Sequence, residues 1–375
     1  MNFEEHTAKA AVLEPAGIAV LPGRLCATPE AAEAAFAAIG RAVVKAQVPA
    51  GKRGKAGGIR AADTAAEAAA SAKTILGMSI DGYPVKKVLV EQRADIAREF
   101  YAAVVTDFAG RRPLVLFSAQ GGMDIEELAA REPQAVRRCA IDIDRGFAEE
   151  DARAMLAGLE LAGAEAAIAA TLRTLYAIYR QRDAELIEIN PLALLKDGRI
   201  VALDCKLTLD DSALFRQSDL AALGAQEKLT ALERHGAESG LKFIELDGNV
   251  GVLANGAGLT MTTMDAIRHL GGEPANFLEI GGEAYTKAEA ALGLVLARSG
   301  VKSLVINFCG AFARTDVMAE GVVAAWEKLK PNVPVFFSIH GTGEDEALKL
   351  VRERLSIEPF DFMEDAVAAA VEAAR

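Results

Sequence analysis

The sequence predicts two domains that both combine helices and strands, an α+β domain followed by an α/β domain with a parallel sheet. The chain has 375 residues, of which 51% are hydrophobic, and this is enough for two or three domains with sizeable cores. Strand and helix patterns alternate through the C-terminal third, as βαβ units do. We expect residues 1–230 to form the first domain and 240–375 the second, joined by a polar, helical linker at 210–240.

The first domain is predicted to mix early helices, a group of strands, a long helix and a closing pair of strands. The stretch Met155–Leu172 is rich in Ala and Leu, but it carries Glu160 and Glu165, so it reads as a helix of a soluble protein rather than a membrane span. The expected helices are Glu4–Glu14, Pro29–Ile39 and Glu149–Arg180, and the expected strands are Ala42–Gln47, Lys87–Gln92, Ala102–Asp107, Leu114–Ser118, Glu185–Leu194 and Arg199–Leu207.

The second domain is predicted to be a parallel sheet covered by helices. Such a sheet binds ligands at the carboxyl ends of its strands, and several of these ends carry glycine turns. The expected strands are Phe243–Leu246, Val250–Ala254, Asn276–Ile280, Leu304–Phe308 and Val333–Ser338, and the expected helices are Met261–Leu270, Lys287–Arg298, Val317–Leu329, Asp345–Leu355 and Met363–Ala374.

Charge and composition exclude several function classes. The net charge of −12 gives no general attraction for nucleic acid or for an anionic membrane surface, so a polyanionic ligand needs a local site. The four cysteines form no CxxC pair and the four histidines no HExxH motif, which argues against a zinc site or a disulfide framework. The acidic N-terminus lacks the apolar core of a signal peptide, so we expect a cytoplasmic location.

Two glycine-rich stretches are candidates for anion binding. The first, 51–58, contains four glycines and three cations after a predicted strand, but Pro49 and Ala56 break the Walker A pattern. Its backbone N–H groups and its cations would suit phosphates, and a surface loop explains the same residues equally well. The second, 255–261, opens a helix after a strand and lacks the third glycine of a dinucleotide fingerprint, which favours a simple anion site at the helix N-terminus.

A predicted hairpin brings two oxygen-bearing side chains together. Gly198 supplies the left-handed residue of a three-residue turn, and with that register Asn190 faces Asp204 and Glu188 faces Lys206. Such an oxygen pair suits Mg²⁺, which takes one or two protein ligands and completes its shell with water and phosphate. From the hairpin alone, an ordinary half-exposed hairpin with a cross-strand ion pair is the favoured interpretation. Alternation places Ile187, Ile189, Val201, Leu203, Cys205 and Leu207 together on an apolar face.

Ordered motifs over nearly the whole chain resemble one known family. They are Met1-Asn2-Phe3-Glu4-Glu5-His6, the loop after Val43-Val44-Lys45, Glu188-Ile189-Asn190-Pro191-Leu192, Ala213-Leu214-Phe215-Arg216-Gln217, Asn255-Gly256-Ala257-Gly258-Leu259 and Gly271-Gly272-Glu273-Pro274-Ala275-Asn276-Phe277-Leu278. Together they resemble the beta subunit of ADP-forming succinate–CoA ligase. The resemblance implies an ATP-grasp domain followed by a flavodoxin-like CoA-ligase domain. It also implies a partner alpha subunit whose histidine is phosphorylated by ATP or GTP with Mg²⁺, a small carboxylic acid that receives the phosphate, and CoA that displaces it.

The resemblance also implies roles for individual residues. Asn190 and Asp204 correspond to the Mg²⁺ ligands, and Glu188 to a catalytic acid that steadies the incoming histidine loop. The residues expected at the nucleotide are Lys45, Lys52, Arg53, Gly54, Glu91, Ala94 and Glu99, and those expected at the acid substrate are Asn255, Ala311, Phe312 and Ala313.

The sequence departs from the family pattern at four places, one of which is Cys205, which follows the hairpin acid Asp204 where the family has a small residue. Lys52 stands where the phosphate loop usually has glycine, Gly281-Gly282-Glu283 replaces three glycines, and Cys309-Gly310-Ala311-Phe312 replaces Phe-Gly-Gly-Ile. The bulk of Phe312 is a reason to consider a less polar acid than succinate. The departures leave two alternatives open: a malate–CoA ligase beta subunit, and a non-catalytic paralogue that binds nucleotide or an alpha-type partner as a regulatory or assembly subunit. An ATP-grasp ligase joining an acid to an amine is a weaker third reading.

Overall fold

The computed structural model describes residues 1–225, 228–280 and 286–375, so Gly281-Gly282-Glu283 lies outside the described residues. The chain divides into two compact units, Met1–Lys228 and Leu229–Arg375, which are described one at a time. The expected domain boundaries, 1–230 and 240–375, stay a prediction.

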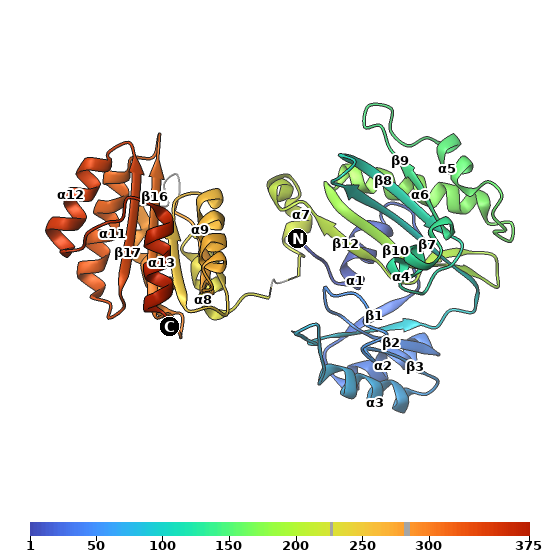
Figure 1. The fold of residues 1–375 in the computed structure, drawn as a ribbon. Coiled ribbons are helices and arrows are strands. Elements are labelled where there is room, and N and C mark those ends of the chain that lie inside the picture. The colour runs from blue at the N-terminus through green and yellow to red at the C-terminus, as the bar shows by residue number, and fades with distance from the viewer. Residues whose placement is uncertain (226–227, 281–285) are drawn as a thin grey trace. The chain divides into compact units, whose positions relative to one another are not determined.

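The first unit contains a small antiparallel sheet covered by two helices (Figure 1). Its strands follow the order β1-β6-β2-β3. Thr28 and Thr64 cap the two helices by accepting hydrogen bonds from the backbone N–H groups of Ala31 and Glu67. The elements are β1 (Gly23–Cys26), α2 (Pro29–Ile39), β2 (Ala42–Ala46), β3 (Ile59–Ala62), α3 (Ala65–Leu76), the two-residue strands β4 (Ser79–Ile80) and β5 (Tyr83–Pro84), and β6 (Val88–Gln92).

A larger antiparallel sheet forms the rest of the first unit. It has the order β11-β10-β7-β8-β9, and β12 also pairs with β10. Its core includes Phe100, Phe117 and Ile187. The elements are α1 (Glu5–Ala8), the π-helix η1 (Lys9–Leu13), β7 (Ile96–Asp107), β8 (Arg112–Ser118), α4 (Ile125–Arg131), η2 (Pro133–Ala135), β9 (Val136–Ala140), α5 (Glu149–Leu156), α6 (Glu165–Gln181), β10 (Ala184–Leu195), β11 (Ile200–Ala202), β12 (Lys206–Leu209), η3 (Asp211–Arg216) and α7 (Ser218–Ala221).

The long helix predicted over Glu149–Arg180 is wrong, because the structure has two helices, α5 and α6, in its place. Between them Gly158 and Gly163 have φ angles of 75° and 82°, and Ala162 is left-handed too. A left-handed residue cannot continue a right-handed helix, and glycine takes this conformation without a steric cost. The helical spacing of apolar residues runs through both helices, because each helix buries an apolar face of its own. The apolar pattern therefore gives no sign of the break between them.

The second unit is built on the predicted parallel sheet. The strands β14, β16 and β17 pair in parallel. The expectation of a wholly parallel sheet is wrong for β13, which pairs antiparallel with β15. Two helices, α9 and α13, pack on one face of the parallel strands, and α10, α11 and α12 cover the other. The elements are α8 (Ala231–Glu238), β13 (Phe243–Glu245), β14 (Val250–Ala254), α9 (Ala257–His269), β15 (Asn276–Leu278), α10 (Ala288–Ala297), β16 (Ser303–Gly310), α11 (Thr315–Leu329), β17 (Val335–Gly341), α12 (Glu344–Leu355) and α13 (Met363–Ala373).

All ten elements predicted between 240 and 375 are confirmed, with ends shifted by a few residues. No helix in the described ranges combines the length and the apolar character that crossing a membrane requires.

Candidate nucleotide and metal site

A cavity of about 460 Å³ in the first unit brings most of the predicted nucleotide and metal residues together. Its wall is contributed by both sheets and by the loop 49–58, which joins β2 to β3. The predicted residues that line it are Lys45, Lys52, Arg53, Gly54, Glu91, Ala94, Glu188, Asn190 and Asp204. Residues separated by well over 100 positions in sequence thus share one cavity.

The predicted hairpin register is confirmed on both sides of an interruption. Leu192 pairs with Ala202 in β11, and Glu188 pairs with Lys206 in β12. Asn190 and Asp204 lie between these two paired stretches, where the regular strand pairing that assigns each side chain to one face of the sheet is interrupted. Both line the cavity.

The prediction that alternate residues share an apolar face is right for one half of the hairpin and wrong for the other. Ile187, Ile189, Cys205 and Leu207 pack into the main core of the large sheet. Val201 and Leu203 pack instead in a separate cluster with Leu21, Ala193 and Leu195. The pairing of β10 with β7 shifts register between Ile189 and Leu192, and a shift of one residue moves every following side chain to the other face.

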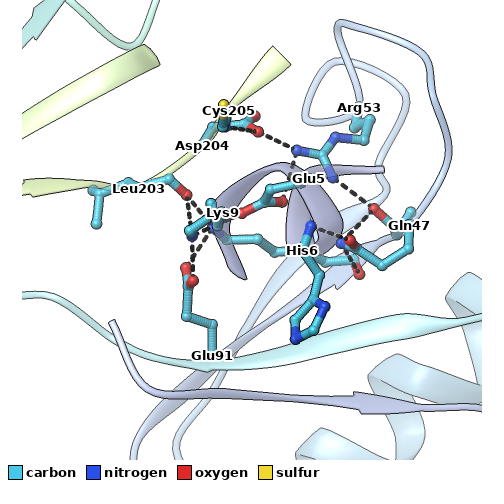
Figure 2. Close-up of polar contacts among 11 residues, drawn as sticks. Glu5, His6, Lys9, Gln47, Arg53, Glu91, Leu203, Asp204 and Cys205 are labelled. Carbon is cyan, nitrogen blue, oxygen red and sulfur yellow. Dashed lines mark hydrogen bonds and ion pairs between the residues drawn. The ribbon is translucent and has the colours of Figure 1, made fainter. Parts of the chain in front are cut away.

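Beside the cavity lies a buried cluster of three cations and three carboxylates (Figure 2). Lys45 Nζ donates hydrogen bonds to Glu5 Oε1 at 2.9 Å and to Glu91 Oε2 at 2.6 Å. Lys9 Nζ donates to Glu5 Oε1 at 3.1 Å and to Glu91 Oε1. Both ammonium groups also donate to the carbonyl oxygen of Leu203.

Arg53 connects this cluster to Asp204, one of the two predicted metal ligands. Its Nη1 donates to the carbonyl oxygen of Ala46 at 2.7 Å and its Nη2 to Asp204 Oδ1 at 2.6 Å. The same Nη2 lies 2.7 Å from Glu5 Oε2, an ion pair in which no donor is aligned for a hydrogen bond. Asp204 Oδ1 also accepts from the backbone N–H of Cys205.

The balance of charge around Glu5 and Lys45 keeps both of these side chains ionised. Burial would raise the pKa of Glu5, but Lys45, Arg53 and Lys9 outweigh it and hold that pKa well below its usual value. Burial would likewise lower the pKa of Lys45, and the carboxylates of Glu5, Glu91 and Asp204 raise it instead. Lys45 therefore stays positively charged, and Glu5 negatively charged, at physiological pH.

The glycine-rich loop is tied to the segment before α4. Lys52 has a left-handed backbone, with φ of 56°, and its Nζ lies 2.8 Å from Asp124 Oδ2. Lys55 Nζ contacts the same oxygen at 3.4 Å and donates to Glu127 Oε1 at 3.0 Å. The hydrogen bond from Lys52 lowers the pKa of Asp124 to about 2. Lys52 thus adds a cation to the cavity rim, where it faces a carboxylate.

The donors at Asn190 and Asp204 fit a hard divalent cation. Asn190 Oδ1 accepts from the backbone N–H of Gly122 at 2.9 Å, and its Nδ2 donates to the carbonyl oxygen of Met123 at 2.9 Å, so the oxygen end of the amide is fixed. Within the described ranges no group of three or more His, Cys, Asp or Glu side chains is placed to hold a metal. Two oxygens with room for water and phosphate are what Mg²⁺ takes.

Glu188 is held by Tyr101 at the wall of the same cavity. Tyr101 Oη donates to Glu188 Oε2 at 3.0 Å. Burial raises the pKa of Glu188, even though the hydrogen bond from Tyr101 and the charge of Lys206 act in the opposite direction. A carboxyl group with a raised pKa at a cavity wall is a typical feature of a functional site.

Glu99 differs from the other predicted nucleotide residues, because it does not line the cavity. It lies on β7, half-buried, and a Cβ added to Gly122 would collide with its Oε2. Gly122 does line the cavity. Glu99 therefore lies directly behind the wall, and its predicted role in nucleotide binding stays untested.

The predicted acid-binding residues lie in the second unit, at the carboxyl ends of β14 and β16. Asn255 follows β14 and exchanges two hydrogen bonds of 2.8 Å with the backbone N–H and C=O of Cys309. The turn after β16 contains Ala311, Phe312 and Ala313, and the Phe312 side chain is fully exposed. These residues lie at one edge of the sheet, the edge at which parallel sheets usually bind their ligands. Their role in binding the acid stays a prediction.

Sequence reasoning missed Glu5, Lys9, Tyr101 and Asp124 as members of the site. Glu5 and Lys9 form an i, i+4 pair, a common signal of an exposed helix face, so nothing in their spacing marks them as buried. Tyr101 alternates with apolar residues of β7 and reads as core. Asp124 precedes α4, a helix that the sequence analysis did not predict.

Comparison with known proteins agrees with this division of the chain. Residues 2–194 match the family model of the ATP-grasp domain, and residues 253–371 match that of CoA-ligase. The beta subunit of GDP-forming succinate–CoA ligase from Thermus thermophilus is 45% identical over 94% of this chain and 93% of its own length. The beta subunit of the ADP-forming enzyme from Rubrobacter xylanophilus is 40% identical over 100% of this chain and 99% of its own.

A solved structure supports the fold at lower identity. The structure of ATP citrate lyase from Methanothrix soehngenii, in complex with citrate and coenzyme A, has a TM-score of 0.76 at 23% identity, with 99% of each chain covered. At this identity the likeness shows the fold alone. The full-length identity to the first two relatives shows more: this chain belongs to the family of succinate–CoA ligase beta subunits, with an ATP-grasp domain followed by a CoA-ligase domain.

Proposed function

We propose that this chain is the nucleotide-binding beta subunit of a nucleoside-diphosphate-forming succinate–CoA ligase, and that it phosphorylates a histidine on a partner alpha subunit. The observation that carries the proposal is the cavity in which Asn190 and Asp204 lie beside Lys45 and Arg53. An oxygen pair for a divalent cation next to buried cations is the arrangement that a Mg-nucleotide requires. The names of the relatives point to the same reaction.

Each side chain has a role that follows from its place. Asn190 and Asp204 would hold Mg²⁺, which when bound neutralises phosphate charge. Lys45 and Lys52 would contact phosphate oxygens, while Arg53 would hold Asp204 in place through its hydrogen bond. The remaining predicted residues would form other parts of the nucleotide cavity. Its wall would include Gly54, Glu91 and Ala94, and Glu99 would support that wall from behind. Glu188, with its raised pKa, would receive the incoming histidine loop.

The nucleotide is proposed to be ATP or GTP. The relatives include both ADP-forming and GDP-forming enzymes, so similarity does not separate the two. Direct competition between the nucleotides for the isolated chain decides the point.

Succinate is the proposed acid, bound at the carboxyl edge of the second unit. Asn255 fixes the backbone at the end of β16, just before the turn that contains Ala311, Phe312 and Ala313. The exposed Phe312 ring would meet the carbon chain of an acid bound there. A malate-specific enzyme is not favoured, because the relatives are named for succinate, and a cytoplasmic location stays an expectation.

One observation favours a second candidate function, a regulatory paralogue that binds nucleotide without catalysis. Lys52 occupies a left-handed position and its exposed side chain pairs with Asp124, so a phosphate must compete with a carboxylate for it. The intact set of Lys45, Asn190 and Asp204 favours the catalytic subunit.

The test is transfer of labelled phosphate. The chain, its natural alpha subunit and Mg²⁺ are mixed with γ-labelled ATP or GTP, and acid-labile label on alpha is measured. Label that depends on Asn190 and Asp204 supports the catalytic subunit. Tight binding of both partner and nucleotide without label would instead support the regulatory paralogue.

A further inference from the structure

The ammonium groups of Lys9 and Lys45 share their hydrogen-bond acceptors. Both donate to Glu5 Oε1, both donate to the carbonyl oxygen of Leu203, and each takes one oxygen of Glu91. A lysine has three N–H donors, so each ammonium group is saturated by these acceptors. As it stands in this structure, Lys45 has no donor left for a phosphate oxygen.

The two lysines differ in their access to the cavity. Lys45 lines it, and its side chain is 9% exposed, whereas Lys9 does not line it and is 4% exposed. A phosphate entering the cavity can therefore meet Lys45 but not Lys9. To bind that phosphate, Lys45 must give up one or more of its three acceptors.

Loss of Lys45 from the cluster would matter most to Glu91. Glu5 keeps an ion pair with Arg53 when Lys45 leaves, and the Leu203 carbonyl keeps its bond to Lys9. Glu91 is a buried carboxylate, 2% exposed, whose described ion pairs are those with Lys45 and Lys9. A buried carboxylate without a counter-ion is strongly unfavourable, so Lys9 decides whether Lys45 is free to move.

From this geometry we propose that Lys9 is a positioning residue that holds the Glu91 carboxylate so that Lys45 can move to the phosphates of the nucleotide. The inference rests on the proposed function, because it needs a nucleotide in this cavity. Lys9 touches no substrate. It provides the second cation that keeps the Glu91 carboxylate paired in both positions of Lys45.

The test measures equilibrium binding of Mg-ATP and Mg-GTP to the full-length chain. In Lys9→Met, Lys45 becomes the sole described counter-ion of Glu91, and we expect binding to weaken by roughly tenfold or more. The loss should disappear in the Glu91→Gln background, since a neutral amide needs no counter-ion. It should persist in the Glu5→Gln background, which leaves Glu91 charged and serves as the matched control.

The outcomes separate this inference from the proposed function. If the unaltered chain binds neither nucleotide, both fail. If it binds and Lys9→Met binds equally well, or if the loss is the same in both backgrounds, only the role of Lys9 is overturned. Should Lys9→Met fail to fold, the charge-balanced variant Lys9→Met/Glu91→Gln is compared with Glu91→Gln alone. Equal affinities support the proposal, and a tenfold difference contradicts it.

Discussion

Asn190 and Asp204 lie opposite each other in a hairpin whose register is the same before and after them, at an interval where regular pairing is interrupted. The interruption turns both side chains to the cavity that Lys45 and Arg53 also reach. The strands on either side fix the positions of the two oxygens, so the hairpin itself determines the geometry of the proposed metal site.

We predict that Asn190→Ala and Asp204→Asn each weaken Mg²⁺-dependent nucleotide binding by at least about 10–100-fold. Asn190→Ala removes one of the two oxygen ligands and Asp204→Asn removes the negative charge of the other, while the hairpin keeps its flanking pairs. Titration of Mg²⁺ at fixed nucleotide measures the effect. Glu185→Gln, on the same strand and outside the cavity, is the control. An unchanged Mg²⁺ requirement in both variants would contradict the assignment.

Glu5→Gln should destabilise the protein at pH 7 by about 3 kcal/mol, because it leaves buried cations with one carboxylate fewer. The pKa of Glu5 is lower in the folded state than its ordinary value of 4.5. Its charge therefore stabilises the fold above that pH, and the contribution is lost as the pH falls further. Denaturant unfolding at pH 7 and pH 4 should show the gap to the unaltered protein narrowing in acid. The neighbouring Glu4→Gln is the control, and a gap independent of pH would refute the argument.

Tyr101→Phe should raise the pKa of Glu188 further, because it removes a hydrogen bond that lowers this pKa. If ionised Glu188 is needed for phosphoryl transfer, the acidic limb of the pH–rate profile moves to higher pH. Tyr179→Phe removes a hydroxyl that bonds Thr106, away from the cavity, and should leave the profile unchanged. Identical profiles for the two variants would rule out this role of Tyr101.

Replacement of Lys52 separates its backbone from its charge. Its φ of 56° is one that glycine adopts more easily than alanine, so Lys52→Gly should be more stable than Lys52→Ala by roughly 1 kcal/mol or less. Both variants lose the cation, and nucleotide binding should become less sensitive to salt in each. Thermal unfolding and binding at two ionic strengths measure the two effects. If the alanine variant were the more stable of the two, the left-handed backbone at residue 52 would not be strained and the argument would fail.

Phe312→Ile should change the choice of acid without changing stability, because the Phe312 side chain is fully exposed. A panel of dicarboxylic and monocarboxylic acids, assayed with the complete enzyme, tests this. We expect the unaltered enzyme to accept less polar acids relatively better than the Ile variant. Succinate as the best substrate of both by the same wide margin would remove the proposed role of Phe312.

The sequence was most informative where local patterns determine structure. Gly198 predicted the turn and hence the pairing of Glu188 with Lys206, and the βαβ alternation predicted the ten elements between residues 240 and 375. The prediction placed Val201 on the wrong face of the hairpin. The register shift near Asn190 leaves the alternation of polar and apolar residues unchanged, so the sequence does not reveal it. Thr64 and Glu67 carried the spacing of a helix start, so α3 was within reach of the sequence.

The candidate site was predictable only in part for a similar reason. The resemblance placed Lys45, Asn190 and Asp204, and the structure brings them to one cavity. Lys9 and Glu5 could not be recognised, because an i, i+4 ion pair usually lies on a solvent-exposed helix face. Only the tertiary structure, which places that pair against Glu91, gives it a part in the site.

The most direct test of the central claim is phosphoryl transfer from γ-labelled ATP or GTP to the alpha subunit from the same source. The account predicts acid-labile label on alpha that requires Mg²⁺ and is lost in Asn190→Ala and Asp204→Asn, but not in Glu185→Gln. Absence of label from the unaltered pair, with nucleotide and partner both shown to bind, would contradict the catalytic assignment of this cavity.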